Sequence, residues 1–404
     1  MEANTLLTIL VPAFAALFAT MWFQPHILKV AKEKNIVDNP DARKLQRIPI
    51  PVMGGIAVVF GLMVGIMCFT LFGDFNNMLA VLAAVVVIML VGLVDDIRGL
   101  SPKIRFIIEI LLVWYLIEAT GNQINNFHGL WGINIIHNWI SVPLTIFACV
   151  GIINAVNLID GVDGYSSGYC IMASIYFAIV FIRLGNMKMV ALAAIIIAAL
   201  LPFFFCNVFG KHSKMFIGDA GTLSMGILIS TFVRNMLTAS TDSTAIADNL
   251  GLIPLSLAIM SVPIFDTLRV MGARMLRGTS PFHPDKTHLH HAFIDLGFSH
   301  IGTTFSILCL NTLVVICWFI AYKLGASADV QLYIVIALSA LITFGFYWFV
   351  QYNIRHNTRI LRWLKAVGRA THLERKGIWG VLQRWLDRNS TPQEEEEEKH
   401  EKVA

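Results

Sequence analysis

Acidic and amide side chains are concentrated in the stretch 154-NAVNLIDGVDG-164, where a long apolar run ends. Asp160 and Asp163 are three residues apart and would share one face of a helix. Gly161 and Gly164 would let the backbone approach a ligand closely. Ionisable residues at the edge of a membrane-like segment are costly and indicate a functional site. The stretch therefore predicts a ligand site, and the alternative is a polar turn between two apolar segments.

Two further acidic motifs stand where apolar segments begin or end. Asp95 and Asp96 are adjacent, so on a helix their side chains would point about 100° apart. Asp219 belongs to 216-FIGDAG-221 and precedes the first turn of an apolar segment, where free N–H groups favour anions. The simpler interpretations are solvated carboxylates for the pair and a helix N-cap for Asp219. All three acids are candidates for the same site as Asp160.

The loop 278-GTSPFHPDKTHLHHAF-293 adds histidines and a lysine. His288 and His291 would share a helical face, while His290 would point elsewhere. A lone histidine is usually structural. Three histidines in the run HLHH, close to Lys286, indicate a functional group instead.

Carboxylates gathered at one place need a balancing positive charge. Mg²⁺ takes one or two carboxylates together with water and substrate phosphates. A set of ligands rich in aspartate and without cysteine favours such a hard cation over zinc. The six cysteines all fall in apolar segments and are interpreted as small packing residues. The sequence thus predicts a Mg²⁺ site, with Mn²⁺ as an alternative.

These residues must be positioned by helices that cross a membrane. The chain is 56% hydrophobic and only 14% charged, which is too apolar for a soluble protein of 404 residues. Roughly 20 apolar residues cross the hydrocarbon layer. We expect an all-α polytopic integral membrane protein with about 11 transmembrane helices, without an inverted repeat or a broken pair of helices. The predicted spans are 5–25, 52–72, 77–97, 104–120, 140–157, 166–183, 189–206, 217–237, 250–271, 302–322 and 330–350.

The distribution of lysine and arginine predicts the orientation. With eleven spans, the 30 basic residues divide 26 to 4 between the two sides. The positive-inside rule then places the N-terminus outside and the C-terminus in the cytoplasm. The acidic motifs and the histidine loop all fall on the cytoplasmic side, so the site is expected to face the cytoplasm.

The chain changes character beyond the last predicted span. Residues 1–350 form the expected transmembrane domain. Residues 351–389 alternate apolar and basic positions, which predicts a basic amphipathic helical tail on the anionic cytoplasmic leaflet. A solvated helix that contacts a partner is the alternative. Residues 390–404 are an acidic run, which predicts a disordered tail.

Five motifs occur together and in order: LVGLVDDIRGLSPKIR, NAVNLIDGVDG, KMFIGDAGTLSMG, PIFDTLRVMGARMLRGTSPF and HPDKTHLHHAFIDLGFSH. This set resembles the polyprenyl-phosphate N-acetylhexosamine-1-phosphate transferases, also called glycosyltransferase family 4. The resemblance runs from about residue 25 to residue 350. It departs in the first loop, where Gln46 and Val52 replace the histidine and the basic residue frequent among relatives. No site residue is therefore assigned to that loop.

The resemblance implies a reaction and its substrates. UDP-GlcNAc and undecaprenyl phosphate would give undecaprenyl-diphosphate-GlcNAc and UMP, which initiates a cell-surface glycan such as O-antigen. It further implies a multi-pass protein of the bacterial inner (cytoplasmic) membrane, in contact with the lipid bilayer and with no nucleic acid partner. The oligomeric state is left open, with a homodimer as one option.

The resemblance also implies roles for individual residues. Asp219 would bind Mg²⁺, and Asp95 and Asp96 would handle the lipid phosphate or its proton. Asp160 and Asp163 would complete the catalytic set. Substrate-binding residues would be Asn157, Lys103, Asn207, Lys286, His288, His290 and His291. Arg105 is a further candidate cation.

Three alternatives remain open from the sequence. The donor could be UDP-MurNAc-pentapeptide, which would give lipid I, although the histidine loop resembles that branch less. A cation-coupled transporter would place acids near the centres of spans, whereas the acidic motifs of this chain gather at one face. A CDP-alcohol phosphotransferase would need a DGxxAR core, which is absent. Direct attack by the lipid phosphate and a covalent aspartyl intermediate both fit the sequence.

Overall fold

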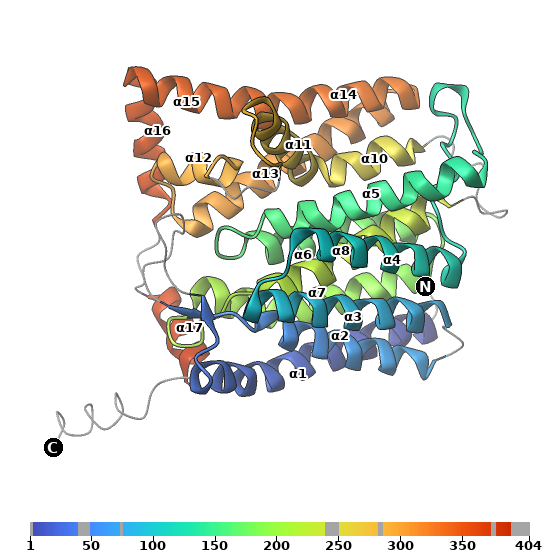
Figure 1. The fold of residues 1–404 in the computed structure, drawn as a ribbon, viewed down its shortest axis with the longest axis horizontal. Helices are drawn as coiled ribbons and strands as arrows, with labels where there is room; N and C mark the ends of the chain where they lie inside the picture. The colour runs from blue at the N-terminus through green and yellow to red at the C-terminus, as the bar shows by residue number, and fades with distance from the viewer. Residues whose placement is uncertain are drawn as a thin grey trace.

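The computed structural model describes residues 3–38, 49–72, 76–238, 250–281, 286–372 and 377–388. Gln46 and the predicted acidic tail lie outside these ranges. The described chain is almost entirely helical, and most of the long helices run roughly along one direction (Figure 1). One two-residue antiparallel pair joins β1 (Val37–Asp38) to β2 (Ile50–Pro51).

The helices follow one another along the chain with short connections. Their bounds are α1 Ala3–Glu33, α2 Gly54–Thr70, α3 Asn76–Arg98, α4 Pro102–Thr120, η1 Leu130–Gly132, α5 Asn138–Leu158, α6 Tyr165–Arg183, α7 Met187–Phe209, α8 Gly218–Leu237, α10 Leu252–Ile259, α11 Ser261–Leu276, α12 Leu289–Asp295, α13 His300–Lys323, α14 Ala328–Ala340, η2 Leu341–Gly345, α15 Phe346–His356, α16 Arg359–Ala370 and α17 Ile378–Asp387. Each predicted span falls on one of these helices or on a consecutive set of them.

The prediction of an all-α polytopic membrane protein is confirmed. Among the described residues, seven helices are long and apolar enough to cross a membrane, and a bent pair would make eight. The other three predicted spans correspond to α2, which has 17 residues, to α4, which carries several charges, and to α8. The count of eleven stays a prediction.

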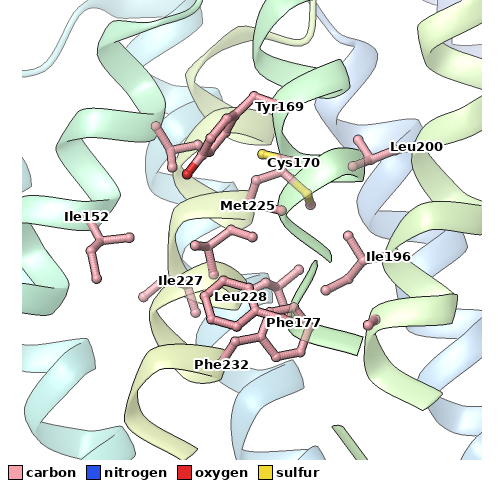
Figure 2. Close-up of a cluster of buried hydrophobic side chains, with 14 of the residues drawn as sticks. Ile152, Tyr169, Cys170, Phe177, Ile196, Leu200, Met225, Ile227, Leu228 and Phe232 are labelled. Atoms are coloured by element: carbon pink, nitrogen blue, oxygen red, sulfur yellow. The ribbon is translucent and has the colours of Figure 1, made fainter. Parts of the chain in front are cut away.

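Helix α8 runs through the middle of the bundle and is buried along nearly its whole length. Its apolar side chains Leu228 and Phe232 pack against Phe177 of α6 (Figure 2). Small residues let neighbouring backbones approach it, as in other membrane helix pairs. A Cβ at Gly92 of α3 would lie 2.4 Å from the backbone nitrogen of Ala220, and one at Gly226 would lie 2.6 Å from Cα of Ile153 in α5. This close packing brings the ends of α3 and α5 to the start of α8.

The predicted span 250–271 is broken, contrary to the expectation of no broken helix. Helices α10 and α11 meet at an angle of 72°. Asn311 of α13 satisfies the break: its side-chain oxygen accepts from the Val262 N–H at 3.1 Å, and its Nδ2 donates to the Ile259 carbonyl at 2.9 Å. A side chain from another helix thus replaces bonds that a continuous helix would make itself.

The tail contains the helices α16 and α17. Leu361 of α16 packs with Leu296 and Val350, while the basic residues of α16 are exposed. Thr371, just after α16, accepts a hydrogen bond from the Ser299 N–H at 2.9 Å. The tail is therefore anchored to the segment between α12 and α13, and its contact with the leaflet stays a prediction.

Candidate active site

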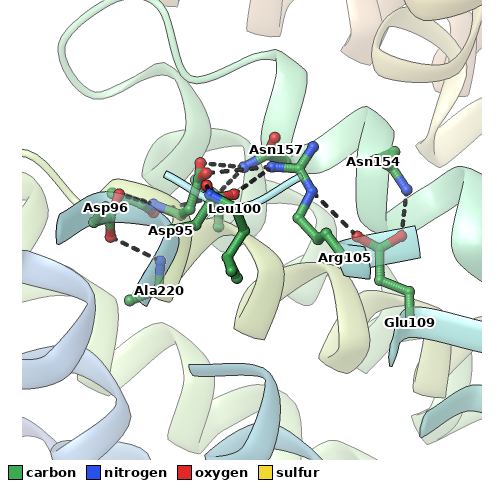
Figure 3. Close-up of polar contacts among 11 residues, drawn as sticks. Asp95, Asp96, Leu100, Arg105, Glu109, Asn154, Asn157 and Ala220 are labelled. Carbon is green, nitrogen blue, oxygen red and sulfur yellow. Dashed lines mark hydrogen bonds and ion pairs between the residues drawn. The ribbon is translucent and has the colours of Figure 1, made fainter. Parts of the chain in front are cut away.

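The C-terminal ends of α3 and α5 meet the start of α8, and the start of α4 lies beside them (Figure 3). Asp219, in the first turn of α8, stands at the centre. Its Oδ1 accepts a hydrogen bond from Nδ2 of Asn157 at 2.7 Å, and its Oδ2 lies 3.3 Å from Nη1 of Arg105. The structure thus brings together a predicted metal ligand, a predicted substrate-binding amide and a candidate cation.

Asp95 and Asp96 point at different partners, as their adjacency predicts. Asp95 Oδ2 lies 3.1 Å from Nη1 of Arg105, and Oδ1 accepts from the Leu100 N–H at 2.6 Å. Asp96 accepts from the backbone N–H groups of Asp219 at 2.8 Å and Ala220 at 3.1 Å. Asp96 therefore caps α8 and fixes where Asp219 stands, while Asp95 faces the same cation as Asp219.

Arg105 is held in place by a buried acid, and an amide binds that acid in turn. Neither was among the predicted site residues. The side chain of Glu109 is fully buried, and its Oε1 lies 3.6 Å from Nε of Arg105. Asn154 of α5 donates a hydrogen bond to its other oxygen. Arg105 and Glu109 are four residues apart, so they share a helical face. An acid inside an apolar run, four residues after an arginine, was the signal in the sequence that could have revealed this pair.

The turn 159–164 carries the two aspartates of the opening motif. Asp160 accepts a hydrogen bond from Oγ of Ser166 at 2.6 Å. Asp163 Oδ2 lies 2.6 Å from Nζ of Lys214 and 2.7 Å from Nδ1 of His300. Neither Lys214 nor His300 was predicted as a site residue, because both are far from Asp163 in sequence.

The two aspartates differ in their electrostatics. Desolvation raises the pKa of Asp160 to about 7, with the charges of Asp219 and Asp163 adding to it and the hydrogen bond from Ser166 opposing it. Asp160 is exposed to solvent, so water screens part of the interactions that raise its pKa. For Asp163, burial would also raise the pKa, but the hydrogen bond from His300 and the charge of Lys214 outweigh it and hold the pKa below its usual value. Asp163 is therefore ionised, and Asp160 titrates near neutral pH.

Asn207 is buried, and both ends of its amide are used by the backbone. Its oxygen accepts from the Gly164 N–H at 2.6 Å, and its Nδ2 donates to the Met215 carbonyl at 2.9 Å. This side chain ties the turn 159–164 to the segment that leads into α8. Its predicted contact with substrate stays a prediction, whereas its role in shaping the site is visible.

The histidine loop is fixed to α11 by a buried network. Asp266 accepts from Nη2 of Arg269 at 2.5 Å and from the Leu289 N–H at 3.1 Å, and its Oδ2 lies 2.9 Å from Nδ1 of His288. Arg269 also donates to the Thr287 carbonyl at 2.6 Å, and its guanidinium lies over the Tyr347 ring. The negative charge of Asp266 and the positive charge of Arg269 therefore compensate each other.

The fixed loop places His290 directly against the turn 159–164. The His290 ring is buried, and burial, reinforced by the neighbouring His291 and His288, holds its pKa well below the ordinary value. It is therefore neutral, and its Nε2 has no hydrogen-bond partner among the described residues. The centroid of its ring lies 4.4 Å from that of His291.

The two predicted lysines lie farther from this group. Lys103 is exposed in the first turn of α4 and forms no ion pair with the described residues. Arg105, two residues later, contacts the acids in its place. Lys286 is exposed in the histidine loop, and its charge acts on Asp295. Substrate contacts of both lysines stay predictions.

The acids fit a hard cation only together with ligands from a substrate. Asp95 Oδ2 and Asp219 Oδ2 already converge on one positively charged nitrogen of Arg105. In the part of the chain that the structure describes, no set of three or more His, Cys, Asp or Glu side chains is arranged to hold a metal. Mg²⁺ needs only one or two carboxylates when phosphates and water complete its shell. Asp219 and Asp95 suit that kind of site.

Replacing Gly161 with alanine should disturb the site through His290. A Cβ at Gly161 would lie 2.2 Å from Nε2 of His290, whose ring is buried and cannot swing away. The φ angle of Gly161 is not positive, so alanine adds no backbone strain. Overpacking of this kind costs about 1–3 kcal/mol. We expect Gly161→Ala to lower turnover at least ~10-fold, measured on purified protein.

Gly151 provides the matched control. A Cβ there would meet nothing within 4 Å, so Gly151→Ala should leave turnover unchanged. Equal activity of the two variants would show that the contact between the turn and His290 has no bearing on the site.

The chain is similar to known proteins along most of its length. A family model described as glycosyl transferase family 4 matches residues 78–236, a range that includes Asp95, Asp160 and Asp219. A Bacillus subtilis (strain 168) protein named "Probable undecaprenyl-phosphate N-acetylglucosaminyl 1-phosphate transferase" is 29% identical over 347 residues, 86% of this chain and 91% of that protein.

Enterobacterial relatives show the same similarity. An Escherichia coli O157:H7 protein named "Undecaprenyl-phosphate alpha-N-acetylglucosaminyl 1-phosphate transferase" is 27% identical over 382 residues, 92% of this chain and 98% of that protein. A Salmonella typhi protein of the same name is 28% identical over 358 residues, 86% of this chain and 91% of that protein. The matches to these relatives therefore cover most of the chain.

Proposed function

We propose that the chain is a member of glycosyl transferase family 4 and that it transfers GlcNAc-1-phosphate from UDP-GlcNAc to undecaprenyl phosphate. An oxygen of the lipid phosphate forms a bond to the phosphorus next to the sugar. The bond from that phosphorus to the oxygen bridging it to the uridine phosphate breaks, and UMP leaves. The product is undecaprenyl-diphosphate-GlcNAc, a starting unit for a surface glycan.

The single observation that supports this proposal most strongly is the group around Asp219. Acids from α3 and α8 face one guanidinium, that of Arg105, next to a turn that carries two more aspartates. Two anionic substrates must approach each other in this reaction, which requires positive charge at fixed positions. Carboxylates hold the guanidinium of Arg105 and the ammonium of Lys214 in place, and both groups are of the kind that binds phosphate oxygens.

We also propose that Asp219 and Asp95 hold a Mg²⁺ ion. When bound, such an ion neutralises charge on the diphosphate and on the leaving phosphate. Asn157 orients Asp219 by its hydrogen bond, and Asp96 fixes the helix end that carries it. The neutral His290 can donate or accept a hydrogen bond at the turn 159–164 without adding charge.

The direct test follows label from the donor into lipid. Purified protein should move radiolabel from UDP-GlcNAc into an organic-soluble product only when undecaprenyl phosphate is present, release UMP in equal amount, and stop when EDTA removes divalent cations. Transfer from UDP-MurNAc-pentapeptide but not from UDP-GlcNAc would assign the other donor. Absence of any lipid-linked product with active relatives as positive controls would refute the proposed reaction.

The proposed topology is eleven spans in the bacterial inner membrane with the site facing the cytoplasm. The 26 to 4 division of basic residues supports it. A phosphatase or fluorescent reporter fused at Ser390 is expected to report the cytoplasm. One inserted at Asn134, in the segment between α4 and α5, is expected to report the opposite side. A periplasmic signal at Ser390 would refute the orientation, because nucleotide sugars are supplied from the cytosol.

A further inference from the structure

A carboxylate near the C-terminus is buried in the loop that joins α7 to α8. Asp387 ends α17 and is 7% exposed. Its Oδ1 accepts from the backbone N–H groups of Lys211 at 3.0 Å, His212 at 3.0 Å and Ser213 at 2.9 Å, and from Oγ of Ser213 at 2.8 Å. Its Oδ2 accepts from Lys211 N–H at 3.1 Å. Three successive N–H groups around one anion form a nest.

Other contacts hold the same loop and α17 in place. Nζ of Lys32 in α1 donates to the His212 carbonyl at 2.9 Å and is attracted by the Asp387 carboxylate. The Phe209 ring, at the end of α7, stacks on Trp379 of α17 with centroids 4.9 Å apart. The nest is therefore enclosed by α17 and by the C-terminal ends of α1 and α7, which lie together at one end of the bundle (Figure 1).

The loop leads directly into the active site. Lys214 follows the nest, and its Nζ contacts Asp163 at 2.6 Å. The next residue, Met215, is held through its carbonyl by Asn207, which also binds the Gly164 N–H. The backbone of Lys214 is thus fixed on both sides, on one side by Asp387 and on the other by Asn207.

We propose that Asp387 is a positioning residue for the active site. Its carboxylate folds residues 211–213 into the nest and so sets the backbone from which Lys214 reaches Asp163. Lys214 is the group at the site, and Asp387 acts through it. The proposal rests on the proposed function for its activity measurements, and it gives the C-terminal helix α17, beyond the residues that the family model matches, a part in the reaction.

Removing the carboxylate should weaken the reaction without abolishing it. We expect Asp387→Ala to lower kcat/KM about ten-fold, the equivalent of about 1.4 kcal/mol. Asp387→Asn keeps an oxygen acceptor but loses the charge, so its loss should be smaller. Asp329→Ala is the matched control, because Asp329 also accepts from a backbone N–H, that of Trp131 in η1 at 2.7 Å, but at the opposite end of the bundle. It should leave kcat/KM unchanged.

A double-mutant cycle separates positioning from a general loss of stability. If Asp387 acts through Lys214, then adding Asp387→Ala to Lys214→Met should lower kcat/KM by at most about two-fold further. The reason is that the effects of substitutions at interacting residues are not additive. A further full ten-fold loss in the double variant would overturn the proposal. The same would follow if Asp387→Ala and Asp387→Asn both retained wild-type kcat/KM.

Trypsin tests the loop without any activity measurement. Cleavage after Lys211 and Lys214, followed by mass spectrometry, should be at least several-fold faster in Asp387→Ala than in the wild type or Asp329→Ala. Unchanged cleavage would overturn the role of Asp387 in ordering the loop. If wild-type protein failed to use UDP-GlcNAc, the proposed function would fall, while the trypsin comparison would still decide whether Asp387 orders the loop.

Discussion

Asp219→Asn is expected to lower turnover about 10³-fold, a size known for the loss of one group that stabilises charge in a transition state. The exchange removes a carboxylate that lies 3.3 Å from Arg105 and accepts a hydrogen bond from Asn157. An amide in its place offers no charge to a divalent cation. Its NH₂ group, itself a donor, would also face the donor group of either Asn157 or Arg105. The measurement is initial rate against Mg²⁺ concentration for purified protein that elutes as a single species.

Glu118→Gln is the control for this exchange. Glu118 is an exposed carboxylate near the far end of α4, so its replacement by an amide should leave the rate unchanged. Near-normal turnover of Asp219→Asn at ordinary Mg²⁺ would exclude Asp219 as a metal ligand. A loss that disappears at high Mg²⁺ would instead support weakened metal binding as its cause.

Asp160→Asn should have the second largest effect, a fall in kcat of about 10²-fold, within the range typical of positioned acid–base groups. The exchange keeps the size of the side chain and an oxygen that can accept from Ser166, so the turn should remain folded. What it removes is the charge beside Asp219 and Asp163. Turnover and thermal unfolding of the same preparation separate the two effects.

The raised pKa of Asp160 adds a dependence on pH. Because the pKa lies at about 7, the carboxyl becomes protonated as pH falls through 7. If the ionised form is required, kcat of the wild type should decline over that interval, while Asp160→Asn cannot titrate and should lack this decline. An Asp160→Asn variant with wild-type kcat and an unchanged pH profile would make the turn 159–164 a structural connection only.

The sequence by itself determined the helices. An apolar run of about 20 residues in a membrane must satisfy its backbone internally, so each such run becomes a helix. All eleven predicted segments coincide with helices for this reason. The break between α10 and α11 was not predictable, because Asn311, about 50 positions away, supplies the bonds that make it possible.

The sequence also determined which residue types gather at the site. Asp95, Asn157 and Asp219 were predicted from polar residues at the ends of apolar runs, and the structure brings them around Arg105. The adjacency of Asp95 and Asp96 further predicted that they would diverge, since neighbouring helical side chains point about 100° apart.

Tertiary structure alone decided which partner each polar group has. Glu109 with Asn154, Asp163 with Lys214, and Asp387 with the loop 211–213 join residues from 45 to 176 positions apart. Asn207 likewise gained a backbone role that its position in the sequence did not reveal. A buried polar group must find a hydrogen-bond partner, but the packing of the helices chooses it. That packing depends on close approaches such as Gly92 to Ala220, which only the folded bundle displays.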